Sequence, residues 1–130
     1  MKTLSTLLAL SLLVSPLTAA DPDSAVQEHR VRAAAALEKD LKADPDNSEL
    51  WIHLGFAYRK TDDLPRAQAA FEKALVLNPK STESLYMLGM IYESKGQKAE
   101  AQKTWNTYLT LENDATKRAV AEKHIHHLSQ

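Results

Sequence analysis

The sequence predicts an all-α fold, a short αα-solenoid of about six helices that pack in successive pairs. A 34-residue pattern is written twice between Ser48 and Ala115, and its apolar residues recur at the spacing of one helix face. No stretch alternates polar and apolar residues as a half-buried strand would, and no loop is rich in glycine. We therefore expect a stack of paired helices, preceded by a separate N-terminal segment.

Residues 1–20 have the pattern of an export signal. Lys2 supplies a positive start, 4–17 are mostly apolar, and the small residues at 18–20 predict cleavage before Asp21. The apolar stretch is shorter than the ~20 residues that a membrane span needs. We expect a periplasmic or secreted protein with no membrane insertion after cleavage; an uncleaved anchor is the alternative.

Composition narrows the function of the domain expected at 21–130. There are no cysteines, which excludes a cysteine-linked lipid anchor, disulfides and thiolate metal sites. The formal net charge is −1, from 16 Lys and Arg against 17 Asp and Glu. Such a balance gives no electrostatic footprint for nucleic acid, so nucleic-acid binding is not expected.

The segment 24–45 predicts an N-terminal capping helix that forms a half-repeat. Its tail matches the second helix of the 34-residue unit at four positions, which are Ala33, Leu37, Leu41 and Pro45. Asp40 breaks the match, since the unit has alanine there. The alanine run at 33–36 could instead be only a strong helix-forming stretch.

Residues 48–81 and 82–115 are predicted as repeat 1 and repeat 2, each a pair of helices. We expect Asn47 or Ser48, Asp62 or Asp63, and Ser81 to cap helix starts, because their short side chains accept hydrogen bonds from free amides. Pro65 is tolerated in a first helical turn, and Gly96 permits a tight turn between two helices.

The first copy carries eight spaced signature residues, which are Trp51, Leu54, Gly55, Tyr58, Ala67, Phe71, Ala74 and Pro79. The chain thereby resembles the tetratricopeptide-repeat family. The resemblance implies a right-handed solenoid that offers a binding surface and has no active site. We therefore expect no enzyme activity and no cofactor.

The C-terminal segment 116–130 is predicted as a capping helix that begins near Asp114. Ala121, Ile125 and Leu128 share one face. The repeat register is ambiguous there, because strict counting places Glu122 and His126 at apolar positions. Terminal repeats are usually atypical, and a wetted outer face accounts for this pattern.

The family resemblance places partner binding on the concave face, at five positions in the first helix of each repeat. These positions hold Glu49, Ile52, Phe56, Arg59, Lys60, Glu83, Tyr86, Met90, Glu93 and Ser94. Large apolar residues among them predict an exposed interaction patch, unless the flanking helices cover it. The chaperone-binding branch of the family grips a chain terminus with Lys and Asn at two of these positions. Ile52 and Phe56 stand there, so that clamp is absent.

The leading interpretation is a scaffold or adaptor of the bacterial cell envelope that binds a protein or peptide partner. An alternative is a haem- or metal-handling accessory protein using His124 and His127, which lie three residues apart on one helix face. Two imidazoles without a third ligand make a weak site, so no metal site is assigned. Self-association into a homo-oligomer is a third interpretation.

Overall fold

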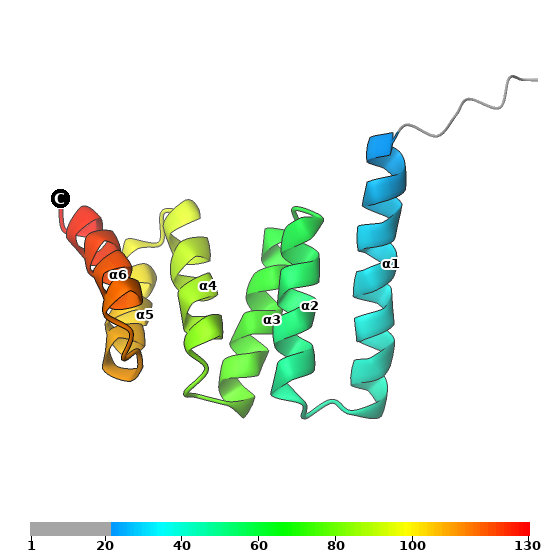
Figure 1. The fold of residues 1–130 in the computed structure, drawn as a ribbon, viewed down its shortest axis with the longest axis horizontal. Coiled ribbons are helices and arrows are strands. Elements are labelled where there is room, and N and C mark those ends of the chain that lie inside the picture. Colours follow the sequence, from blue (N-terminus) through cyan, green and yellow to red (C-terminus); the bar gives the residue numbers. More distant parts are fainter. Residues whose placement is uncertain (1–21) are drawn as a thin grey trace, which may run out of the picture.

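The computed structural model describes residues 22–130, and helices are the only regular secondary structure in that range (Figure 1). The helices are α1 (Pro22–Ala43), α2 (Ser48–Lys60), α3 (Leu64–Leu77), α4 (Thr82–Ser94), α5 (Lys98–Leu111) and α6 (Ala115–Leu128). The prediction of an all-α solenoid is thus confirmed. The signal peptide predicted at 1–20 lies outside the described residues.

The helices stand side by side in a row, with α1 at one end and α6 at the other (Figure 1). Each helix packs against the next one along the chain, and the contacts are most extensive within the pairs α2–α3 and α4–α5. Among the described helices, none combines the length and hydrophobicity that crossing a membrane requires.

Helix starts follow the predicted capping residues. The Asn47 side chain accepts hydrogen bonds from the amides of Glu49 and Leu50, and Ser81 accepts one from Ser84. Asp63 caps α3, with proline in its first turn. Each bond satisfies an amide that has no partner within its helix.

The turns between paired helices share one conformation. Asp62 and Gly96 are 34 positions apart and have φ angles of 60° and 70°. Glycine adopts this left-handed region freely, whereas a side chain there is unusual and aspartate is among the residues that tolerate it. The repeat therefore extends to the backbone of its turns.

The two helices of each repeat approach closely at a glycine of the first helix. A Cβ atom at Gly55 would lie 2.7 Å from the Phe71 ring, and one at Gly89 would lie 2.6 Å from the Trp105 ring. Both rings are fully buried. Glycine is therefore required at both crossings, because a larger side chain would displace a packed ring.

The core consists of two clusters that meet near α4. The first joins residues of α1, α2, α3 and α4 and includes Leu88, which is 2% exposed. The second joins Leu85, Ala101, Trp105, Tyr108 and Ala121 from α4, α5 and α6. Leu88 belongs to repeat 2 yet packs in the first cluster, so this cluster spans both repeats.

A tyrosine in the first helix of each repeat donates a hydrogen bond to a glutamate in the preceding helix. Tyr58 donates to Glu38 of α1, and Tyr92 donates to Glu72 of α3 at 2.8 Å. Both tyrosines and both glutamates are 34 positions apart. Burial, followed by the hydrogen bond to Glu72, raises the pKa of Tyr92 to about 12.

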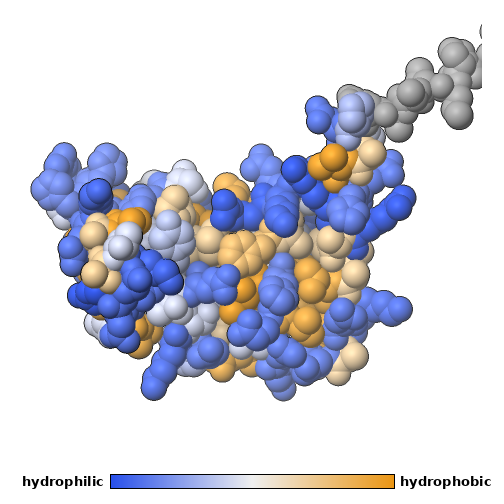
Figure 2. All heavy atoms as spheres, viewed as in Figure 1, coloured by the Kyte–Doolittle hydropathy of each residue, from blue (hydrophilic) through white to orange (hydrophobic). Residues whose placement is uncertain are grey.

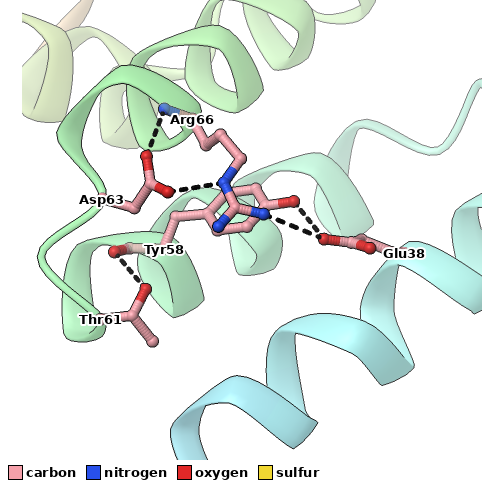
Figure 3. Close-up of polar contacts among 5 residues, drawn as sticks. All are labelled: Glu38, Tyr58, Thr61, Asp63 and Arg66. Atoms are coloured by element: carbon pink, nitrogen blue, oxygen red, sulfur yellow. Dashed lines mark hydrogen bonds and ion pairs between the residues drawn. The ribbon is translucent and has the colours of Figure 1, made fainter.

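Figure 3 shows that the first of these contacts is part of a larger polar junction. Arg66 pairs with Asp63 at 2.6 Å, and its guanidinium carbon lies 4.5 Å from the centre of the Tyr58 ring. A nitrogen of Arg66 also lies 3.9 Å from Glu38. The junction connects α1, α2 and α3, and it orients α1 against repeat 1.

Candidate partner-binding groove

A cavity of about 570 Å³ opens between α2, α4, α5 and α6, and we call it the groove. Its walls are apolar and aromatic side chains with a polar edge. They comprise Phe56, Thr82, Glu83, Tyr86, Met87, Tyr108, Glu112, Thr116, Lys117 and Val120. Pockets that bind ligands commonly combine such apolar walls with a few polar groups.

Two aromatic residues of the groove are held from behind by core rings. Phe56 packs edge-to-face on Phe71, and Tyr86 packs in the same way on Trp105, each with ring centres 5.3 Å apart. Phe56 and Tyr86 are each half-buried. Each therefore presents a positioned aromatic surface, and little side-chain entropy remains to be lost on binding.

The polar edge of the groove centres on Glu112. Its carboxylate accepts hydrogen bonds from the Asp114 amide at 2.9 Å and from the Tyr108 hydroxyl at 3.1 Å, with Lys117 at 3.9 Å. The amide of Asp114, then Tyr108 and Lys117, lower the pKa of Glu112. Burial, followed by the hydrogen bond to Glu112, raises the pKa of Tyr108 to about 12. The edge thus holds a charged carboxylate and a protonated phenol at neutral pH.

The α6 wall is held in place by polar contacts to α4 and α5. His124 stacks on Trp105 with ring centres 4.6 Å apart, and its Nδ1 lies 2.9 Å from the Glu93 carboxylate. The Trp105 indole also donates to Glu93. Arg118 donates to the carbonyl oxygens of Leu109 and Glu112, near the C-terminal end of α5. These contacts position the α6 wall of the groove.

Two family models, both described as tetratricopeptide repeat, match residues 48–81 and 70–103. The chain belongs to the tetratricopeptide-repeat family. A search of curated proteins gave no match. Repeats of this family form a protein-interaction module.

Solved structures of tetratricopeptide-repeat domains have the same fold. One is the first such domain of Spaghetti (RPAP3) bound to the HSP90 peptide SRMEEVD, with a TM-score of 0.69 and 24% identity over 83% of each chain. Another is the TPR2B domain of yeast Sti1 in a pHsp70 complex. Its TM-score is 0.68 at 16% identity, over 83% of this chain and 89% of that one.

Within this tetratricopeptide-repeat domain, three of the residues predicted to bind a partner line the groove. They are Phe56, Glu83 and Tyr86. Lys60 lines a second cavity beside α1 instead. Whether any of these residues contacts a partner stays a prediction.

The predicted exposure of Ile52 is wrong. Ile52 is 3% exposed and lies in the core cluster that joins α1, α3 and α4 to α2. It is buried because α2 has packed neighbours on both sides, whereas the prediction treated its face as open to solvent. Ile52 therefore cannot contact a partner without local unfolding.

Other predicted residues lie outside the groove. Glu49, Arg59 and Ser94 are exposed, as is Met90 at 38%. Arg59 directs a guanidinium nitrogen to the Met87 sulfur at 3.4 Å. Glu93 is occupied by Trp105 and His124, so it holds α6 in place and is not a free acidic group.

The sequence analysis did not predict that α6 lines the groove, although the 34-residue pattern indicates it. Counting 34 residues on from Thr82, Glu83 and Tyr86 reaches Thr116, Lys117 and Val120, and all six line the groove. The unit therefore continues into α6 at its groove positions.

The histidine hypothesis gains no geometric support. His124 is engaged with Glu93 and stacks on Trp105, whereas His127 is exposed. Within residues 22–130, no group of three or more His, Cys, Asp or Glu side chains is arranged to hold a metal ion.

Proposed function

We propose that this protein is a scaffold or adaptor that binds a protein or peptide partner in the groove. The observation that carries the proposal is the groove itself, an open cavity with Phe56 and Tyr86 as positioned aromatic walls. Aromatic residues are enriched where proteins bind one another. Two structures of similar fold were solved with an HSP90 peptide and with pHsp70, which supports a peptide partner here.

The partner segment is one with an apolar or aromatic side chain. The chaperone-binding branch of the family holds a terminal carboxylate with Lys and Asn, but Ile52 and Phe56 occupy those positions. Ile52 is buried and Phe56 presents a ring, so neither offers a charge to a chain terminus. Apolar contact with Phe56, Tyr86 and Val120 would supply most of the affinity, while Glu83 and Lys117 would select polar neighbours.

The proposed place of action is the bacterial cell envelope. The tripartite pattern of residues 1–20 supports export. Intact mass and N-terminal sequencing of the native protein should show a chain that begins near Asp21. A soluble cytoplasmic form that retains Met1 would contradict the proposal.

The groove is tested by obstructing it without disturbing the core. Thr116 is exposed and lines the groove, so Thr116→Trp should fill the cavity. Ala119, also exposed on α6 but outside the groove, provides the matched control Ala119→Trp. With the purified protein as bait in envelope extract, we expect Thr116→Trp to lower partner capture at least about tenfold. Capture that Thr116→Trp leaves at the level of the control would overturn the proposed site.

A further inference from the structure

Helix α1 exposes a face whose equivalent on α3 is covered by another helix. Ala33 and Leu37 of α1 stand 34 positions before Ala67 and Phe71 of α3. Ala67 and Phe71 are 0% exposed, because α2 packs on this face with Gly55 against the Phe71 ring. In α1, by contrast, Ala33 is exposed and Leu37 is only half-buried.

The opposite face of α1 is packed in the register of a repeat. Ala34 and Leu41 are buried, and Glu38 accepts the hydrogen bond from Tyr58, as Glu72 does from Tyr92. Helix α1 therefore occupies the position of the second helix of a repeat. The first helix of that repeat has no counterpart among residues 22–130.

A cavity of about 720 Å³ lies where that first helix would pack, between α1 and α2. Its apolar lining includes Val26, Ala33, Leu37 and Ala57, and Val26 is 49% exposed. Figure 2 shows hydrophobic side chains gathered between α1 and α2, and others near the N-terminal end of α1, framed by hydrophilic atoms. We call this surface the α1 face.

Among residues 22–130, the polar side chains that line the α1 face include no carboxylate. They comprise two lysine or arginine side chains and two histidines, which are Arg30, Lys60, His29 and His53. Arg30 donates a hydrogen bond to the Lys60 carbonyl at 3.2 Å, which holds its guanidinium at the end of α2. Asp40, at the repeat position of the buried Ala74, is exposed and does not line this cavity. An apolar floor with a basic rim at one end is complementary to a segment with an apolar side and acidic residues.

We propose that the α1 face binds an amphipathic helix of a partner protein that completes the half-repeat in trans. The apolar side of that helix packs on Val26, Ala33 and Leu37, and its acidic residues lie beside Arg30 and Lys60. The surface differs from the groove, with which it shares only Phe56, so the inference does not rest on the proposed function.

The probe is a capped peptide with the sequence of α4, Thr82–Ser94, because α4 is a first helix without lysine or arginine. Helices α2 and α4 run in the same direction (Figure 1), so a first helix bound at the α1 face would place the counterpart of Glu93 at the Lys60 end. Amide chemical shifts of the labelled chain that begins at Asp21, which is the proposed mature form, report binding. We expect saturable shifts at Ala33 and Leu37, and at least about tenfold weaker binding when lysine replaces that glutamate in the peptide.

Two substitutions on α1 make the test specific. Ala33→Glu should abolish peptide binding, because it places a carboxylate on the apolar floor. Ala35 is also exposed but lines a separate depression beside Arg66, so Ala35→Glu should leave peptide binding unchanged. Thr116→Trp in the groove should also leave it unchanged, so a failure of the groove and a failure of the α1 face are distinguishable.

Other outcomes would assign the α1 face to a different occupant or show that it is not a binding surface. No saturable binding by either peptide, or equal binding by the Ala33→Glu protein, would overturn the proposal. A dimer in sedimentation that Ala33→Glu dissociates would assign the surface to a second copy. A native protein that retains residues 1–20, and that binds the peptide only when they are removed, would assign the surface to residues 1–20. Either of these two results would overturn the proposal that the helix of a partner protein binds there.

Discussion

The two terminal helices complete the array in different ways. Helix α6 takes the position of a first helix after repeat 2, where Ala121 is fully buried, His124 stacks on Trp105, and Arg118 reaches carbonyls near the end of α5. Helix α1 takes the position of a second helix before repeat 1 and leaves Val26 and Ala33 open. Within residues 22–130, the C-terminal end of the array is closed by α6, whereas α1 leaves an exposed face at the N-terminal end.

The difference follows from what each helix can pack against. A first helix at the end of the array meets both helices of the preceding repeat, as α6 meets α4 through Glu93 and α5 through Trp105. Helix α1 is a second helix whose first helix has no counterpart among residues 22–130, and it packs mainly on α2. A half-repeat thus closes an array at its C-terminus but leaves an apolar face at its N-terminus.

The largest predicted effect tests whether the two ends share one core. Leu88→Ala should lower the free energy of unfolding by about 2–5 kcal/mol, because Leu88 is 2% exposed and the site cannot collapse fully. Urea unfolding followed by both circular dichroism and tryptophan fluorescence should still show one transition. Two separate transitions, or a loss of about 0.5 kcal/mol or less, would mean that the repeats are not packed as one unit.

The next prediction compares the helix crossings of the two repeats. Gly55→Ala and Gly89→Ala should each destabilise by about 1–3 kcal/mol, since the new Cβ would lie under 3.0 Å from a buried ring. Helix propensity alone predicts the opposite sign, a gain of up to about 1 kcal/mol for glycine to alanine. Denaturant melts decide between the two. A stabilised Gly89→Ala protein would show that Trp105 moves aside at little cost.

Substitutions of two histidines on α6 test whether this helix is held against the C-terminal end of the array. His124→Ala should cost about 1–2 kcal/mol, because Glu93 loses a partner and the Trp105 ring loses its stacked neighbour. His127 is exposed, so His127→Ala should stay within about 0.5 kcal/mol of the original. Hydrogen exchange of α6 amides should rise only in the first variant. Equal effects of the two changes would show that α6 is not held by the Glu93 contact.

Local sequence signals predicted the repeats well. The caps at Asn47, Asp63 and Ser81 depend on residues two or three positions away, and each is found as expected. The crossings at Gly55 and Gly89 follow from the 34-residue count. Such features are set within one unit, and a pattern that repeats reveals them.

Features that depend on distant neighbours were not predictable in this way. Burial of Ile52 requires helices on both sides of α2, and the Glu93–His124 contact joins residues 31 positions apart. Glu122 and His126 stand 34 positions after Leu88 and Tyr92, yet both are exposed. Among residues 22–130 no further helix packs over them. The register therefore looked ambiguous, although the groove positions of α6 keep it.

The smallest predicted effect is a loss of stability at alkaline pH, and it is absent at neutral pH. It allows the tyrosine contacts along the array to be compared. Burial and Glu72 raise the pKa of Tyr92 from 10.0 to about 12, and burial and Glu112 do the same for Tyr108. The pKa of Tyr58 is also raised, by burial and Glu38, but the nearby Arg66 opposes the shift. A raised folded-state pKa contributes stability that is fully present below the unfolded-state value and is lost as pH rises through the folded-state value.

The free energy of unfolding should therefore fall between about pH 10 and about pH 12, as tyrosines of the unfolded chain lose their protons first. Tyr92→Phe should flatten this fall more than Tyr58→Phe, because no cation lies among the groups that shift the pKa of Tyr92. Urea melts at several alkaline pH values, with tyrosinate absorbance of the folded protein as a second readout, measure both slopes. A larger change from Tyr58→Phe would mean that Arg66 does not offset Glu38, and that the junction holding α1 is weaker than its geometry indicates.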